Sequence, residues 1–313
     1  MSDHFSRRRF LSGLAAAGAT ASLPVAAASA PAAKRFRFVH LTDPHCMADR
    51  RADQGLAACL KAVEKLKPLP DFILTGGDLV NDVLNSDAVT AKADFARFLQ
   101  VLRDNTDLPV RHCIGNHDVF GWQRDEEAIR RDPQYGKRMV CDVLELPKTY
   151  YHFDHQGWRF FVLDDIQNSA GSRGRYEGYL DEEQMAWFQT ALEATPAAMP
   201  KAVVCHIPIL TVTVFQPAFR RDDAFQIEPY VMCRDSLELT ALLARHNVKL
   251  ALSGHIHMLD RIDYRGVTYI CDGAVSGSWW RGPHHGFEEG FGVIDASPDG
   301  TFTHRYHDYG WQV

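Results

Sequence analysis

The sequence lacks several features that would each indicate a particular class of protein. Its seven cysteines include no Cys-x-x-Cys pair, which argues against a disulfide framework and against a zinc ribbon. After the first thirty residues no run of about eighteen apolar residues occurs, so the mature chain is expected to have no stable membrane anchor. The net charge is −6, so no general attraction to nucleic-acid polymers is expected.

Linkers, internal repeats and blocks of like charge are also missing from residues 34–313, and one domain is the simplest organisation. Apolar residues make up 46% of the chain, which is enough for a large core. Short β-branched or aromatic runs alternate with helical spacing, as is typical of an α/β domain. Strands are predicted at residues 36–41, 72–75, 110–114, 160–163, 202–205 and 250–253, with C-terminal β-hairpins at 259–270 and 291–306.

Apolar residues at helical spacing predict helices around residues 56–66, 95–102 and 185–192, the last capped by Asp181. Two stretches, residues 120–148 and 209–234, are long for connections in such a domain. We expect these two insertions to cover a functional face and to take part in substrate selection.

Residues 1–33 have the composition of an export signal: a basic segment, an apolar run at 11–23 and then small residues. The element from Ser6 to Leu11 resembles the twin-arginine signal, which is read by a receptor and is not an anchor. The apolar run is too short and too rich in Gly and Ala to span a bilayer. We expect cleavage between residues 28 and 34, the twin-arginine translocation machinery as a partner, and a periplasmic or extracellular mature protein.

Polar residues stand directly after five of the predicted strands. Each of these short groups alone is more often a turn or a strand-end residue with its hydrogen bonds satisfied. In an open α/β sheet, however, the carboxyl ends of the strands converge on one crevice. The residues are Asp43, His45, Asp78, Asn116, His117, Asp118, His206, His255 and His257.

Seven of these side chains offer nitrogen or oxygen donors of the kind that bind iron, manganese or zinc. In an extended backbone residues i and i+2 point the same way, so Asp43 with His45, and His255 with His257, can each turn two ligands toward one site. Cys46 would point the other way and is expected to pack. Seven donors are more than one tetrahedral ion needs, whereas two ions that share a carboxylate would use them all.

In this order the blocks Asp-x-His, Gly-Asp, Gly-Asn-His-Asp, His and Gly-His-x-His resemble the calcineurin-like metallophosphoesterase superfamily over about residues 38–257. The resemblance implies an α/β fold, a four-layer α/β/β/α sandwich of two mixed sheets flanked by helices, with a dinuclear metal site between the sheets. Asp78 is implied to bridge the two ions. The implied ligands are Asp43, His45, Asp78 and His257 for one ion, and Asp78, Asn116, His206 and His255 for the other.

This chemistry predicts a metal-dependent hydrolase of phosphate esters, in which a hydroxide that bridges the ions attacks phosphorus. His117 is expected to be the general acid or a transition-state stabiliser, with Asp118 orienting its ring. By analogy with exported cyclic nucleotide phosphodiesterases of the superfamily, the predicted substrate is a small phosphodiester. The alternatives are a phosphomonoesterase or pyrophosphatase of the same fold and, from another class, a non-catalytic secreted binding protein.

Near the C-terminus, Trp279, Trp280 and Arg281 follow a predicted strand. They can line the crevice, with aromatic faces for a base or acyl group and a guanidinium for phosphate. The alternative is that the tryptophan pair packs a hairpin onto the core. Asp82 is expected to cap a helix or to support a ligand rather than to bind metal itself.

Overall fold

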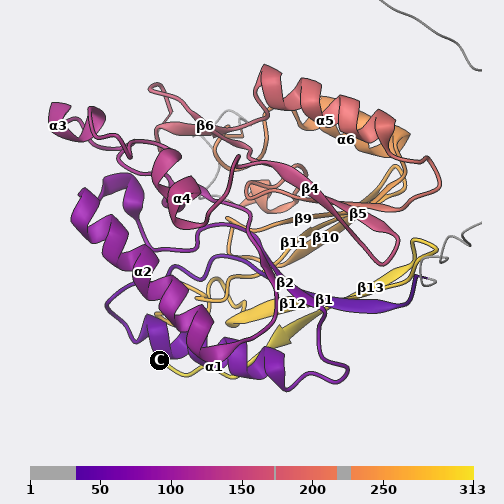
Figure 1. Cartoon of the computed structure of the whole chain (residues 1–313), viewed down its shortest axis with the longest axis horizontal. Coiled ribbons are helices and arrows are strands. Elements are labelled where there is room, and N and C mark those ends of the chain that lie inside the picture. Colours follow the sequence, from indigo (N-terminus) through magenta and orange to yellow (C-terminus); the bar gives the residue numbers. More distant parts are fainter. Residues whose placement is uncertain (1–32, 173, 217–226) are drawn as a thin grey trace, which may run out of the picture. The chain divides into compact units, whose positions relative to one another are not determined.

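Two sheets form the centre of the fold, and helices cover the outer face of each (Figure 1). The computed structural model describes residues 33–172, 174–216 and 227–313, so the predicted export signal lies outside the described residues. The described chain belongs to one compact unit, Ala33–Val313. Among the helices described in it, none is long and apolar enough to cross a bilayer.

The first sheet has the strand order β13-β12-β1-β2-β3 and the second has the order β10-β11-β9-β8-β5-β4. Both are mixed: β1, β2 and β3 run parallel, as do β5, β8, β9 and β11, while β12 and β13 in the first sheet and β4 and β10 in the second pair antiparallel. The strands are β1 Phe36–Leu41, β2 Phe72–Thr75, β3 Val110–Arg111, β4 Tyr151–His155, β5 Trp158–Val162, β8 Lys201–Val204, β9 Val248–Ser253, β10 Asp260–Tyr264, β11 Val267–Cys271, β12 Gly290–Ala296 and β13 Phe302–Asp308.

Four longer helices make the outer layers, with α1 and α2 over the first sheet and α5 and α6 over the second. The side chain of Asp181 accepts a hydrogen bond from the backbone N–H of Gln184, which confirms the predicted cap of α5. The helices are α1 Ala52–Glu64, α2 Ala88–Asn105, α3 Glu127–Arg130, α4 Arg138–Val143, α5 Glu182–Ala194 and α6 Ser236–Arg245.

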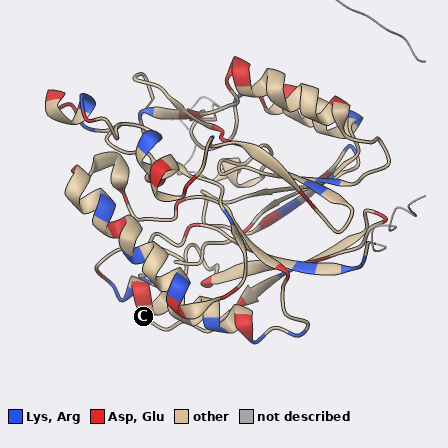
Figure 2. Cartoon of the chain, in the orientation of Figure 1, with Lys and Arg blue, Asp and Glu red and all other residues tan. Residues whose placement is uncertain are grey.

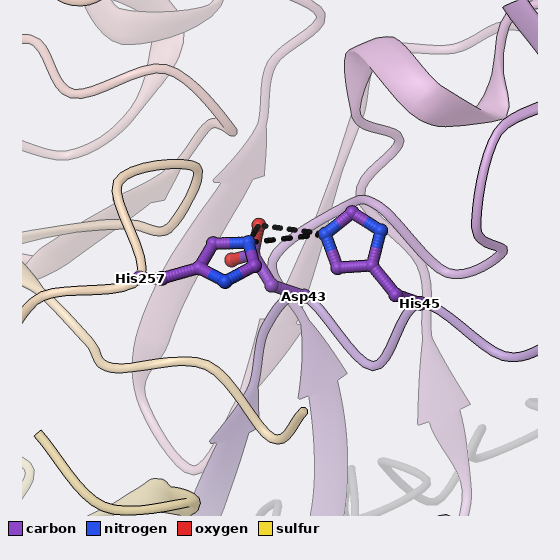
Figure 3. Close-up of side chains that lie close together, drawn as sticks. All are labelled: Asp43, His45 and His257. Atoms are coloured by element: carbon purple, nitrogen blue, oxygen red, sulfur yellow. Dashed lines mark hydrogen bonds and ion pairs between the residues drawn. The ribbon is translucent and has the colours of Figure 1, made fainter. Parts of the chain in front are cut away.

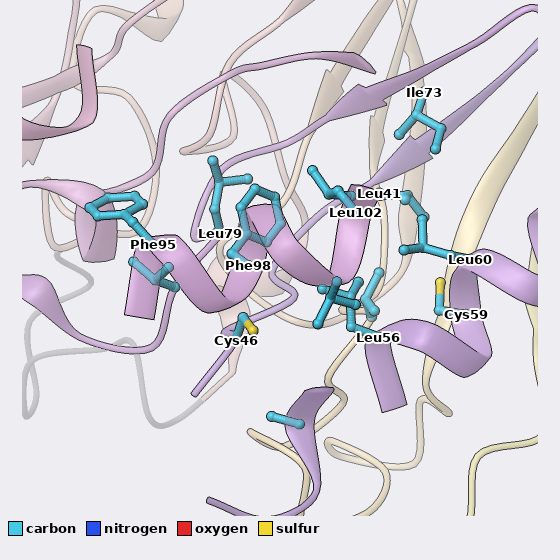
Figure 4. Close-up of a cluster of buried hydrophobic side chains, with 14 of the residues drawn as sticks. Leu41, Cys46, Leu56, Cys59, Leu60, Ile73, Leu79, Phe95, Phe98 and Leu102 are labelled. Carbon is cyan, nitrogen blue, oxygen red and sulfur yellow. The ribbon is translucent and has the colours of Figure 1, made fainter. Parts of the chain in front are cut away.

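The core has three apolar layers because alternate residues of a strand face opposite sides of its sheet. Leu41 and Ile73 face α1 and α2, where they meet residues such as Leu56, Phe95 and Phe98 (Figure 4). The opposite faces of the same strands pack against the second sheet. The predicted four-layer α/β/β/α sandwich is therefore confirmed.

Acidic and basic residues lie side by side on the outer helices, as α1 and α2 show in Figure 2. All seven cysteines are free, and Cys141 alone among them is not fully buried. The thiols of Cys113, Cys205 and Cys271 are buried, and the burial of Cys46 confirms its expected packing role.

The two predicted C-terminal hairpins are confirmed as β10–β11 and β12–β13. The third predicted strand is shorter than expected and ends at Arg111. Beyond it, Cys113 N still donates to the carbonyl and the hydroxyl of Thr75 at the end of β2. Strand β4 and the small hairpin of β6 (Ile166–Asn168) and β7 (Tyr176–Gly178) were not predicted. The insertion at 120–148 contains α3 and α4, and the insertion at 209–234 is described in part.

A buried carboxylate links the two sheets. Asp272 follows β11, and its two oxygens lie 2.8 Å from Nδ1 of His40 on β1 and 2.8 Å from Nε2 of His304 on β13. The carboxylate lies against Gly292, where a Cβ would come 2.3 Å from Oδ2. Although burial raises it, the two histidines hold the pKa of Asp272 well below its usual range.

We expect Asp272→Asn to lower the free energy of unfolding by about 3–5 kcal/mol, because one member of a buried charge network is removed while its partners stay. Urea unfolding measures this change. The control is Asp49→Asn, since the Asp49 side chain is 84% exposed and should cost almost nothing. A loss for Asp272→Asn no larger than that of the control would contradict the linking role.

Candidate metal centre

The predicted site residues lie at the carboxyl ends of parallel strands from both sheets. The first sheet contributes Asp43 and His45 after β1, Asp78 after β2 and Asn116 in the 3₁₀ turn Asn116–Asp118 after β3. The second sheet contributes the remaining three residues, one after β8 and two after β9. Those three are His206, His255 and His257.

The backbone leaves the strands abruptly, so the expected extended geometry of the ligand pairs is wrong. Asp43, His45, Asp78, His255 and His257 all have positive φ, between 40° and 70°. This left-handed conformation costs energy for residues other than glycine and is concentrated at functional sites. Even so, the side chains of Asp43 and His45 approach the same group of donor atoms. Those of His255 and His257 belong to different groups.

One group of donors consists of Asp43, His45 and His257 (Figure 3). The Nε2 atoms of the two histidines lie 3.0 Å apart. Oδ1 of Asp43 is 3.2 Å from Nε2 of His257 and 3.8 Å from Nε2 of His45. All three side chains are buried, and we call them the first cluster.

A second cluster surrounds Nε2 of His206. This atom lies 3.2 Å from Oδ2 of Asp78, 3.1 Å from Oδ1 of Asn116 and 3.2 Å from Nδ1 of His255. Oδ2 of Asp78 is also 3.6 Å from Nε2 of His45. Asp78 therefore faces both clusters, as a shared ligand must.

Two glycines allow the strand ends to come this close. A Cβ on Gly115 would lie 2.2 Å from Oδ1 of Asp78, and a Cβ on Gly77 would lie 2.5 Å from Nδ1 of His206. Gly77 also has φ +94°, a conformation that glycine adopts without strain.

Each of the four histidines in the clusters has its other ring nitrogen next to a backbone carbonyl. Nδ1 of His206 lies 2.7 Å from the carbonyl oxygen of Gly76, and Nδ1 of His257 lies 2.6 Å from that of Gly277. Nδ1 of His45 is 3.4 Å from the carbonyl oxygen of Asn81. In His255 it is Nε2 that lies 2.7 Å from a carbonyl oxygen, that of Tyr230. A carbonyl only accepts, so these nitrogens carry the protons. The opposite nitrogens point at one another and at carboxylate oxygens, and once they are all deprotonated this donor set fits two cations.

The electrostatics of the clusters agree with this assignment. Burial lowers the pKa of His45 to about 3, and burial together with His206 lowers that of His255 to about 4, so both rings are neutral at pH 7. The histidines hold the pKa of Asp78 well below its usual range despite burial. At His206 burial is outweighed by the charge of Asp78, which raises the pKa to about 10. A bound cation must therefore displace that proton.

His117 lies beside the clusters without belonging to the seven predicted ligands. Its ring is 4.9 Å from the ring of His45, between centroids, and its side chain is 25% exposed, so a substrate can reach it. Nδ1 of His117 is 3.6 Å from Oδ1 of Asp82, an ion-pair distance rather than a hydrogen bond. Burial lowers the pKa of His117, but Asp78 and Asp82 raise it to about 9.

The expected role of Asp118 is wrong. Its carboxylate accepts hydrogen bonds from the backbone N–H groups of Leu79, Val80 and Gly115. These bonds tie the loop after β2 to the loop after β3. Asp118 therefore holds the backbone around Asp78, and the carboxylate beside the His117 ring is that of Asp82.

The two tryptophans have different environments. The Trp279 ring lies 4.4 Å from that of His257 and 5.5 Å from that of His45, between centroids, at the edge of the first cluster. Trp280 is only 1% exposed, packs in the core and donates from Nε1 to the carbonyl of His45. The expectation that Trp280 lines the crevice is therefore wrong. Arg281 is an exposed residue of the same loop.

Three groups near the site were not predicted. Asp165 follows β5 and accepts from the backbone N–H of His206 at 3.2 Å; its position after a predicted strand is the signal that could have found it. Burial raises its pKa to about 7. The carbonyls of Tyr230 and Gly277 carry no signal in the sequence, because every residue has a carbonyl.

Comparison with known proteins agrees with this site. Residues 36–259 match the family model of the calcineurin-like phosphoesterases. A 3′,5′-cyclic-nucleotide phosphodiesterase from Nostoc sp. is 27% identical over 74% of this chain and 76% of its own. A serine/threonine-protein phosphatase from Bos taurus is 23% identical over 82% of this chain and 72% of its own.

Among solved structures, a dimetal phosphatase from Danio rerio shares the fold with a TM-score of 0.62 and 14% identity, covering 88% of this chain and 97% of that one. The chain belongs to the calcineurin-like phosphoesterase family. Its fold, its candidate metal ligands and its relatives together support a phosphoester hydrolase.

We expect Asp78→Asn to lower the metal content of the purified protein from two ions per chain to one or fewer, because the amide lacks the shared anionic oxygen. Elemental analysis after removal of free metal measures the content. Asp82→Asn is the matched control, since Asp82 lies four residues further on and should leave both ions bound. Two retained ions in Asp78→Asn would show that this carboxylate does not bridge.

Proposed function

We propose that this protein is a metal-dependent phosphodiesterase with a dinuclear centre. The observation that carries the proposal is the pair of buried donor clusters on either side of Asp78. Asp43, His45 and His257 would hold one ion, and Asn116, His206 and His255 the other, with Asp78 common to both. When bound, such an ion pair supplies charge neutralisation for the phosphoryl oxygens and an activated water as nucleophile.

His117 acts on the leaving group in this proposal. Its ring is next to His45 and partly exposed, and the carboxylate of Asp82 beside Nδ1 favours the protonated form. A protonated imidazole can donate to the departing ester oxygen or stabilise its charge. The backbone N–H of His117 donates to Oδ1 of Asp78 at 2.8 Å, so the position of His117 is tied to that of the shared carboxylate.

Aromatic side chains at both ends of the site favour a diester. Trp279 borders the first cluster. At the other end the Tyr176 ring is 6.0 Å from the His255 ring, and the half-buried Tyr230 ring lies 6.3 Å from that of Tyr176. A diester carries an organic group on each side of phosphorus, and Trp279 and Tyr230 would each border one of them. The cyclic-nucleotide phosphodiesterase among the relatives supports the same choice.

We also propose that residues 1–33 direct export through the twin-arginine route. The support is the arrangement of Arg7, Arg8 and Arg9 before an apolar run and small residues. The mature enzyme would then act on small phosphate esters in the periplasm or outside the cell.

The proposed activity is tested with bis-p-nitrophenyl phosphate and p-nitrophenyl phosphate after loading with manganese, iron or zinc. We expect a higher kcat/KM for the diester, and we expect a chelator to abolish turnover until metal is restored. The reverse preference would indicate a phosphomonoesterase. No turnover of either ester with two ions bound would indicate a binding protein.

We expect His117→Ala to lower kcat by about 10²–10⁴-fold while both ions stay bound, because a proton donor is lost and no ligand is. Asp82→Asn should lower kcat by about 10–100-fold, since the Asp82 carboxylate positions the His117 ring without itself touching the reacting groups. Elemental analysis and steady-state kinetics on the same samples separate the two effects. Loss of metal in His117→Ala equal to that in Asp78→Asn would contradict the role given to His117.

A further inference from the structure

Residues 229–234 of the second insertion run past the second cluster, and we call them the Tyr230 strap. The carbonyl of Tyr230 lies 2.7 Å from Nε2 of His255. Nδ1 of His255 consequently faces Nε2 of His206, 3.2 Å away. The other three cluster histidines present Nε2 to the site, so His255 is turned the opposite way by its carbonyl partner.

The strap is firmly attached on its other side. Gly178 N donates to the carbonyl of Pro229 at 2.7 Å, and Arg234 N donates to the carbonyl of Gly178 at 2.8 Å, so Gly178 of β7 holds both ends. Cys233 N donates to the carbonyl of Pro208 at 2.9 Å. These bonds fix the backbone within which the Tyr230 carbonyl lies.

Val231 joins the strap to the loop that carries the histidines. It is 1% exposed and belongs to a small apolar cluster with Ile256 and Met258, the residues that follow His255 and His257. Packing at Val231 and the hydrogen bond at Tyr230 therefore hold His255 from two sides. The strap does not hydrogen-bond the ring of His257 in the first cluster, because the partner of His257 Nδ1 is the carbonyl of Gly277.

We propose that the Tyr230 strap sets the metal affinity of the second cluster and leaves that of the first cluster unchanged. The inference rests on the proposed dinuclear function. Neutral imidazole binds a cation more tightly when its other N–H has an acceptor that fixes the tautomer and ring orientation. A displaced strap removes that acceptor from His255 alone, so the two ions become unequal in affinity.

The test is Val231→Ala in the full chain, with Val63→Ala as a matched control. Val63 is equally buried, in α1 on the far side of the first sheet, and loses the same two methyl groups. Metal titration followed by chelator competition, with Co²⁺ as a spectroscopic probe, measures the affinity of each ion. We expect Val231→Ala to lower the affinity for one ion by about 10–100-fold and to leave the affinity for the other unchanged.

A second variant disturbs the strap without shortening any of its side chains. In Gly178→Ala the new Cβ would lie 2.9 Å from Cγ2 of Ile207 and 3.3 Å from Cα of Cys233. Displacement of the strap should again lower the affinity for one ion and leave that for the other unchanged. Urea unfolding of all three variants shows whether a change in affinity merely follows a loss of stability.

The outcomes separate this inference from the function on which it rests. Wild-type protein that binds fewer than two ions overturns the dinuclear proposal itself. Wild-type protein with two ions, together with strap variants that bind both as Val63→Ala does, overturns the strap inference alone. Equal weakening of both ions in the strap variants also overturns it.

Discussion

The carboxylate of Asp78 is the constraint on which the rest of the site depends. It is buried between His45 of one cluster and His206 of the other, 3.6 and 3.2 Å from their ring nitrogens. A buried carboxylate is costly unless positive charge lies beside it. Two cations that share this carboxylate would supply that charge, which is consistent with the histidines that converge on it from both sides.

The geometry of each cluster is set by how the two sheets pack, because each cluster takes residues from both sheets. Asp43, His45, Asp78 and Asn116 follow strands of the first sheet, and the other three candidate ligands follow strands of the second. The apolar layer between the sheets and the Asp272 network, which joins β11 to β1 and β13, hold both halves in register. A site divided between two sheets therefore requires a rigid interior.

Much of this could be predicted from the sequence, because polar residues after buried strands must meet at the carboxyl edge of a parallel sheet. The rule located the seven candidate ligands and would also have located Asp165. It did not reveal the left-handed backbone at Asp43 or His255. Nor did it distinguish Trp279 from Trp280, or show that Asp118 holds backbone N–H groups, since these roles depend on tertiary contacts.

The most direct test is a crystal structure of the protein grown with Mn²⁺, with the ions located by anomalous scattering. The account predicts two peaks about 3.5–4 Å apart. Both ions should lie within ligand distance of the Asp78 carboxylate, either at the same oxygen or at one oxygen each. A single peak, or two peaks of which one has no contact with Asp78, would contradict it.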